Sequence, residues 1–109
     1  HLAGSLDRLL TYSRGAALSE AQRVALAAEQ TVHEDRPELS RLLAGLTNGI
    51  DAAIRYLRTL TAESLLVPRE VGRKRLPSNV LGLIFHAAEH SSRHAGQIVT
   101  LSRVVRDHE

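Results

Sequence analysis

Histidines recur at every fourth position in the segment HAAEHSSRHAGQ, which runs from His86 to Gln97 and includes His90 and His94. On an α-helix, side chains four residues apart lie within about 5–6 Å of one another, so two imidazoles in this register can bind one metal ion. A single histidine on a half-buried helix face, in contrast, usually only hydrogen-bonds a carbonyl group. The pair His90 and His94 therefore favours a metal site. Because two histidines of one helix seldom complete such a site, we expect a third ligand from another helix.

The same helix carries a predicted apolar seam with four-three spacing, which is typical of a bundle core. Its members are Val80, Ile84, Ala87, Ser91, His94, Ile98, Leu101 and Val105. At 100° per residue, His94 lies about 40° from the centre of the seam, and His90 and His86 follow in further steps of about 40°. An imidazole beside a leucine seam is unfavourable unless it finds a partner. A metal ion shared by two rings is such a partner.

Composition limits the chemistry that is open to the chain. None of the 109 residues is cysteine, so disulfides and thiolate ligands are excluded, and a metal must be bound by nitrogen or oxygen donors. Fourteen basic against twelve acidic residues give a net charge of +2, which does not favour nucleic-acid binding. No apolar run approaches the roughly 18 residues that would cross a bilayer. The default expectation is a bacterial cytoplasmic protein without membrane association.

The spacing of apolar residues predicts one all-α domain covering residues 1–109. Helices are expected at His1 to about Tyr12, Ser19 to about Gln30, Glu38 to about Leu60, and Ser78 to about Arg106. Ser19 and Gln22 predict a capping box, Ser78 is the expected N-cap of the last helix, and Pro37 suits a first helical turn. The run 33–37 is expected to be a simple connection. Residues 61–77 lack helical periodicity, so we expect a connecting loop there, with room for a short hairpin.

The sequence contains no methionine and begins with a histidine. A translation product starts with methionine, so we expect the chain to be a piece of a longer protein. The first predicted helix also begins without a capping residue, as if it were cut within its length.

The segment from His86 to Ile98 resembles the closing-helix motif of the DinB/YfiT-like superfamily, a group of mostly bacterial, metal-binding four-helix bundles. The opening stretch HLAGSLDRLL is similar to the second helix of that family, whose histidine is the third metal ligand. The long helix and the loop with Arg73-Lys74-Arg75-Leu76-Pro77 lie between them in the family's order. The resemblance covers essentially all 109 residues and implies a four-helix bundle of the DinB/YfiT-like type. The family's first helix and the front half of its second would precede His1.

The resemblance also implies the site residues. It assigns His1, His90 and His94 as ligands of one divalent metal ion, with water in the open positions. His86 matches a motif histidine that is usually not a ligand, and we expect it behind the ligands or facing the substrate. Gln97 lies on the same side of the helix as His90, where it can steady a ligand or a bound water. The alternative, on which the sequence gives no preference, is that Gln97 is simply exposed to solvent and has no role in the site.

Three neutral imidazoles with open positions are typical of a catalytic ion. Zinc or nickel suits these donors best, while manganese and iron stay open. Such an ion lowers the pKa of a bound water or thiol towards neutrality. The resemblance implies an enzyme that activates a low-molecular-weight thiol, a thiol S-transferase acting on a small-molecule substrate, or as second choice a hydrolase. It also implies a homo-dimer.

Two other hypotheses remain open from the residues. One is a non-enzymatic helical module for dimerisation or stress-associated binding, with a vestigial or structural metal. The other gives a role to the basic loop of Arg69, Arg73, Lys74 and Arg75, which would bind an anionic thiol cofactor or DNA; a solvated loop is the simpler interpretation. Glu89 and Arg93 are expected to point away from the histidine row.

Overall fold

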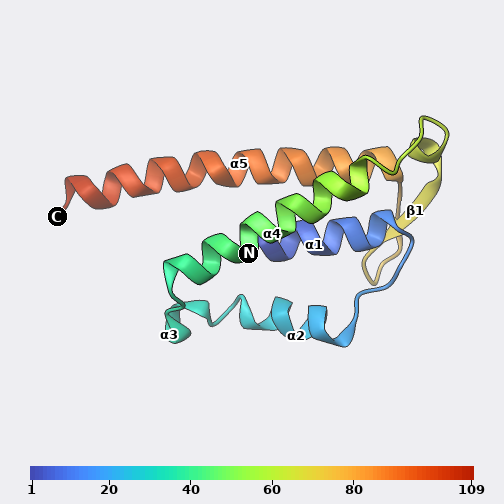
Figure 1. The fold of residues 1–109 in the computed structure, drawn as a ribbon. Helices are drawn as coiled ribbons and strands as arrows, with labels where there is room; N and C mark the ends of the chain where they lie inside the picture. The colour runs from blue at the N-terminus through green and yellow to red at the C-terminus, as the bar shows by residue number, and fades with distance from the viewer.

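The computed structural model describes residues 1–109, and most of them lie in helices. The elements in chain order are α1 (Leu2–Ser13), α2 (Glu20–Ala28), α3 (Val32–Asp35), α4 (Leu39–Leu57), the 3-10 helix η1 (Ser64–Leu66), β1 (Pro68–Val71), β2 (Leu76–Asn79) and α5 (Val80–Asp107). Figure 1 shows α1, α4 and α5 as neighbouring rods, with α2 running back along α1. The molecule is therefore mostly helical, as predicted, with one small sheet added. The four-helix arrangement itself stays a prediction.

The core lies around α1, which packs against both α4 and α5. Three-four spacing places three leucines on one face of α1, where they meet small and branched residues of the two longer helices. The buried cluster consists of Leu6, Leu9, Leu10, Ala53, Leu83 and Ala87. Burying each leucine contributes about 1.5–3 kcal/mol. This packing fixes the position of α1 and so of His1, the residue that precedes it.

The C-terminal end of α1 is held by polar contacts. Ser13 is fully buried, and its hydroxyl shares a hydrogen bond of 2.8 Å with the Tyr56 hydroxyl of α4. The Nε of Arg69, in β1, donates to the Ser13 carbonyl oxygen at 2.8 Å. These bonds tie α1 to both α4 and the hairpin.

The helix starts agree only in part with the sequence expectations. The capping box is confirmed, since the Ser19 side chain accepts from the Gln22 backbone and the Gln22 side chain accepts from the Ser19 backbone. The N-cap of α5 is Asn79, whose side chain accepts from the Gly82 N–H at 2.7 Å. The prediction of Ser78 was wrong because strand β2 continues through Ser78 and ends at Asn79, so the helix begins one residue later than expected.

The connection between α2 and α4 contains more structure than predicted. Val32–Asp35 form the short helix α3, which ends at Arg36 in the left-handed region with φ 43°. Pro37 lies outside α4, whose N-cap is Glu38. A left-handed residue followed by proline turns the chain sharply, so Pro37 does not join the first turn, while α4 begins at Leu39, next to the predicted start at Glu38.

The loop before α5 does contain a hairpin. Strands β1 and β2 are antiparallel, with Pro68 opposite Asn79 and Val71 opposite Leu76. The turn between them has positive φ at Gly72 (70°) and at Arg75 (51°). The hairpin leads directly into α5.

The predicted seam of α5 is buried only near its start. Val80, Leu83 and Ala87 are buried, so Leu83 takes the place that the spacing gave to Ile84. Further along, Ile98, Leu101 and Val105 are 57%, 62% and 57% exposed. The reason is length: α5 has 28 residues and α1 only 12, so the second half of α5 extends past α1 (Figure 1). None of the helices combines the length and apolar character that a membrane-spanning segment needs.

Candidate metal centre

Two of the three predicted ligands lie one turn apart on α5. The Nε2 atoms of His90 and His94 are 3.1 Å apart, and their ring centroids are 4.3 Å apart. Both rings are partly buried on the side of α5 that faces α1. The four-residue spacing alone accounts for this proximity.

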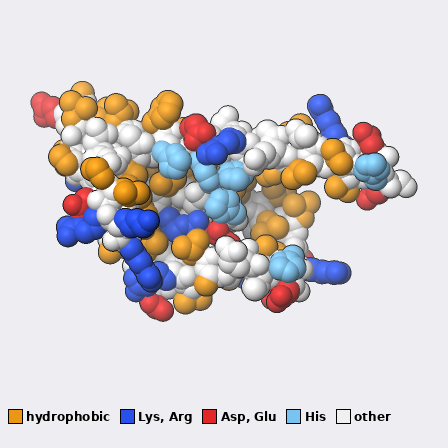
Figure 2. Space-filling model, turned by 180° about the vertical axis from the view of Figure 1, so that it is seen from behind, with side chains coloured by type: hydrophobic (Ala, Val, Ile, Leu, Met, Phe, Trp, Pro, Cys, Tyr) orange, Lys and Arg blue, Asp and Glu red, His pale blue; other side chains and the backbone are white.

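The third histidine comes from the other end of the chain. His1 is the residue before α1, and its Nε2 lies 3.4 Å from the His90 Nε2. The ring centroids of His1 and His94 are 5.0 Å apart. One ligand atom from each of the three rings lies within 4.8 Å of the others. Figure 2 shows a group of histidine side chains in the middle of the face that it draws, with other histidines lying apart from it.

These separations suit a single cation. Zinc-to-nitrogen bonds of about 2.0–2.1 Å in tetrahedral geometry place two ligating nitrogens about 3.3 Å apart. The observed Nε2 separations of 3.1 and 3.4 Å bracket that value. Without an ion, the same contacts require one ring to donate an N–H to the next. The donor set therefore fits a divalent metal that accepts three imidazoles.

The outer nitrogens of the rings have partners of their own. The Nδ1 of His1 lies 2.8 Å from the Oε2 of Glu29, and the carboxylate also accepts from the two terminal nitrogens of Arg8 at 2.7 and 3.4 Å. The Nδ1 of His90 lies 3.3 Å from the Ser5 hydroxyl. When Nδ1 donates to an oxygen, the lone pair stays on Nε2, the atom that faces the other histidines. The Glu29 carboxylate only accepts, so it holds the His1 ring in the tautomer that a metal ligand needs. The Ser5 hydroxyl is both donor and acceptor, so it holds the orientation of the His90 ring and not its tautomer.

The approach of Glu29 depends on a glycine in α1. A Cβ built on Gly4 would collide with the Glu29 carboxylate and approach the Arg8 guanidinium at 2.9 Å. Glycine at this position therefore leaves the space in which the carboxylate reaches both His1 and Arg8.

A family model described as the DinB superfamily matches residues 1–98, a range that contains the three clustered histidines. The chain belongs to the DinB superfamily. No curated protein and no solved structure matches it. The family and the histidine cluster are therefore the two findings on which a function can be built.

In this DinB-superfamily protein, the pKa of His90 differs from that of a free histidine side chain. Its pKa is lowered, first by burial and then by the neighbouring positive charges of His94, Arg93 and His86, against which Glu89 acts weakly. The lowered pKa favours the neutral ring, which is the form that binds metal.

The other sequence candidates lie outside the cluster of three. The His86 ring is 5.9 Å from the His90 ring and about half exposed, with its Nδ1 3.6 Å from Glu89. Gln97 is exposed and makes no side-chain hydrogen bond. Glu89 pairs with Arg93 on the same helix at 3.0 Å. Because its carboxylate also lies beside His86, the prediction that Glu89 points away from the histidine row was wrong.

Sequence reasoning missed Glu29, Arg8 and Ser5. Arg8 and Ser5 follow His1 at helical spacing and could have been found as its neighbours on one face of α1. Glu29 left no such signal, because it reaches His1 only after the chain has reversed between α1 and α2.

Proposed function

We propose that this DinB-superfamily protein binds one divalent metal ion through His1, His90 and His94 and uses it to activate a small-molecule thiol or water. The observation that carries the proposal is the convergence of one nitrogen from each of these rings within 4.8 Å. Zinc and nickel suit three imidazoles best, with manganese and iron as further candidates. When bound with open positions, such an ion supplies Lewis acidity that lowers the pKa of a thiol or water.

The protein groups around the ion have separate tasks in this proposal. Glu29 and Ser5 orient the rings, and the low pKa of His90 keeps its lone pair free at neutral pH. His1 is half exposed, so a small molecule can reach the site from solvent. Thiol S-transfer is the first proposed reaction and hydrolysis the second, and the proposed location is the cytoplasm.

The test is metal analysis of protein that was prepared without a histidine tag. We expect about one equivalent of zinc or nickel by mass spectrometry, lost in His90→Ala and His94→Ala. His33→Ala is the matched control, because His33 is exposed and lies in α3 outside the cluster. Equal metal in all four proteins would reject the site.

A non-enzymatic dimerisation module is the second candidate, and the exposed apolar faces of α4 and α5 favour it. We propose a homo-dimer in either case. Turnover with a panel of thiols and electrophiles separates the two functions. A protein that keeps its metal but turns over none of them would be the binding module.

A further inference from the structure

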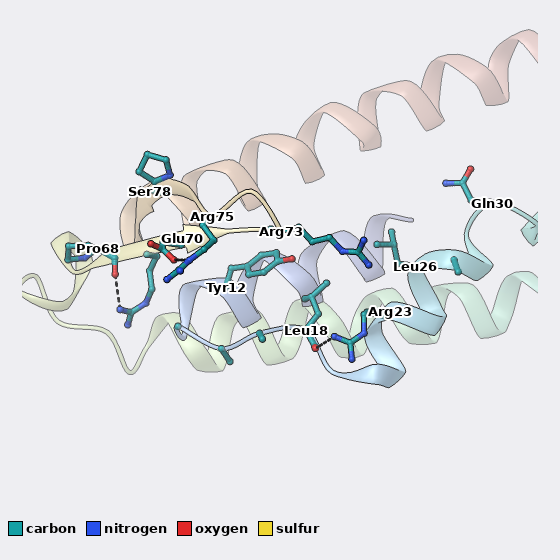
Figure 3. A pocket seen from close by; sticks show the side chains of 17 residues that line it. Tyr12, Leu18, Arg23, Leu26, Gln30, Pro68, Glu70, Arg73, Arg75 and Ser78 are labelled. Atoms are coloured by element: carbon teal, nitrogen blue, oxygen red, sulfur yellow. Dashed lines mark hydrogen bonds and ion pairs between the residues drawn. The ribbon is translucent and has the colours of Figure 1, made fainter.

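A cleft lies between α2 and the β1–β2 hairpin, with the end of α1 at its base (Figure 3). Its volume is about 1190 Å³, which is enough for a small organic molecule. The apolar part of the lining includes Tyr12, Leu18, Leu26 and Ala27. Apolar side chains thus form part of the wall of the cleft, which is open to solvent.

The charged part of the lining is mostly cationic: four arginines and a single glutamate. That glutamate, Glu70, is already paired with the Nε of Arg75 at 2.6 Å. Arg23 binds Glu20 and the Leu18 carbonyl, and Arg69 donates to backbone carbonyls. Arg23 and Arg75 are thus paired with carboxylates, whereas the positive charges of Arg69 and Arg73 have no carboxylate partner.

Arg73 is the arginine without any partner. It follows Gly72 in the hairpin turn and makes no hydrogen bond or ion pair with the protein. In Figure 3 its side chain extends across the cleft towards Leu26, and the Tyr12 hydroxyl points into the same space. An unpaired guanidinium next to apolar side chains suits a ligand that has an anionic group on an apolar body.

The cleft is separate from the histidine cluster. None of the three clustered histidines lines it. Tyr12 comes eleven residues after His1, which at 1.5 Å per residue is about 16 Å along α1. Binding in the cleft can therefore be measured without a metal.

We infer that this cleft is a binding site for a small amphipathic anion, a carboxylate or phosphate carried on a short apolar chain or ring. Arg73 meets the anionic group, while Leu18 and Leu26 contact the apolar part. The inference goes beyond the proposed metal chemistry and does not depend on it.

The test uses sodium octanoate, octyl phosphate and octanol as probes, with amide shifts in nitrogen-15 NMR spectra of the full chain as the readout. We expect the two anions to shift amides of residues 12–27 and 68–78, and octanol, which has the same apolar chain, to bind about tenfold more weakly. Arg73→Gln should weaken binding of the anions about fivefold. Arg103→Gln is the matched control, an exposed arginine of α5 outside the cleft. Whichever of the two anions binds with the higher affinity identifies the anionic group, carboxylate or phosphate, that the site prefers.

Three results would overturn the inference. They are octanol binding as tightly as octanoate, equal affinities in Arg73→Gln and Arg103→Gln, and shifts confined to the exposed leucines of α4 and α5. The octanol comparison uses the unaltered chain, so it decides even if a variant folds poorly. His90→Ala should leave octanoate binding unchanged, so a failed metal site and a failed cleft give different results.

Discussion

Among single residues, Glu29 has the most direct influence on the candidate metal centre. Its carboxylate joins the Nδ1 of His1 to Arg8 and is only 15% exposed. A carboxylate on the outer nitrogen of a ligating histidine raises the basicity of the ring and fixes its orientation. The proposed ligand role of His1, which is the N-cap of α1, depends on this contact.

The variant Glu29→Gln should therefore weaken zinc binding about tenfold, because the amide keeps the shape but loses the charge. Competition with a fluorescent chelator measures the affinity. Glu20→Gln is the control, since Glu20 is exposed and its carboxylate forms an ion pair with Arg23, away from the histidines. If the two variants bind zinc equally well, Glu29 does not position His1.

Gly4→Ala tests the same contact without touching a charge. The new Cβ displaces the flexible ends of Glu29 and Arg8, while alanine favours the helix, so we expect little change in unfolding free energy. Zinc affinity should nevertheless fall. An unchanged affinity would mean that the carboxylate finds His1 by another path.

The low pKa of His90 makes a prediction about pH. The unfolded chain takes up a proton on this ring more readily than the folded one, so folded metal-free protein loses stability as pH falls below about 6.5. Urea unfolding in the presence of chelator, near pH 7.5 and near pH 5.5, measures the loss. The loss of unfolding free energy between the two pH values should be smaller in His90→Gln. An equal loss in both proteins would contradict a lowered pKa of His90.

At the scale of elements, α1 holds the molecule together through its middle and its C-terminal end. The leucines in its middle pack on α4 and α5, and Ser13 at its end is bonded to Tyr56. Because that bond is buried on one side, it contributes about 1 kcal/mol.

Tyr56→Phe should lower the unfolding free energy by about 1 kcal/mol, measured by urea denaturation. Tyr12→Phe is a matched control, because the Tyr12 hydroxyl makes no hydrogen bond within the protein. Equal stabilities of the two variants would show that the Ser13–Tyr56 bond contributes nothing net.

At the scale of the whole molecule, apolar side chains stay exposed along α4 and the second half of α5. They include Leu42, Leu43, Ile50, Leu57, Ile98, Leu101, Val104 and Val105. Many exposed apolar side chains on neighbouring turns of a helix are typical of contact surfaces. They are the structural support for the proposed homo-dimer.

Light scattering should accordingly give the mass of a dimer for the unaltered chain. Ile98→Gln combined with Leu101→Gln should shift the mass towards the monomer, since both residues lie in the exposed part of α5. Val24→Gln removes an equally exposed apolar side chain from α2 and should not. A monomeric mass for the unaltered chain would refute the dimer.

Local spacing was enough to predict much of this protein. The order of the main helices, the capping box at Ser19 and the proximity of His90 to His94 all depend on residues within one or two helical turns. A helical backbone fixes such neighbours wherever it is placed. The family resemblance added His1, which no spacing could supply.

Tertiary structure decided what lies between elements. Glu29 meets His1 across 28 residues of sequence, Arg73 faces α2 only because the hairpin folds back, and the α5 seam ends where α1 stops covering it. Side-chain periodicity describes one helix at a time and carries no information on how long its neighbour is or where the chain reverses. The strand pairing that made Asn79 the cap of α5 is non-local for the same reason.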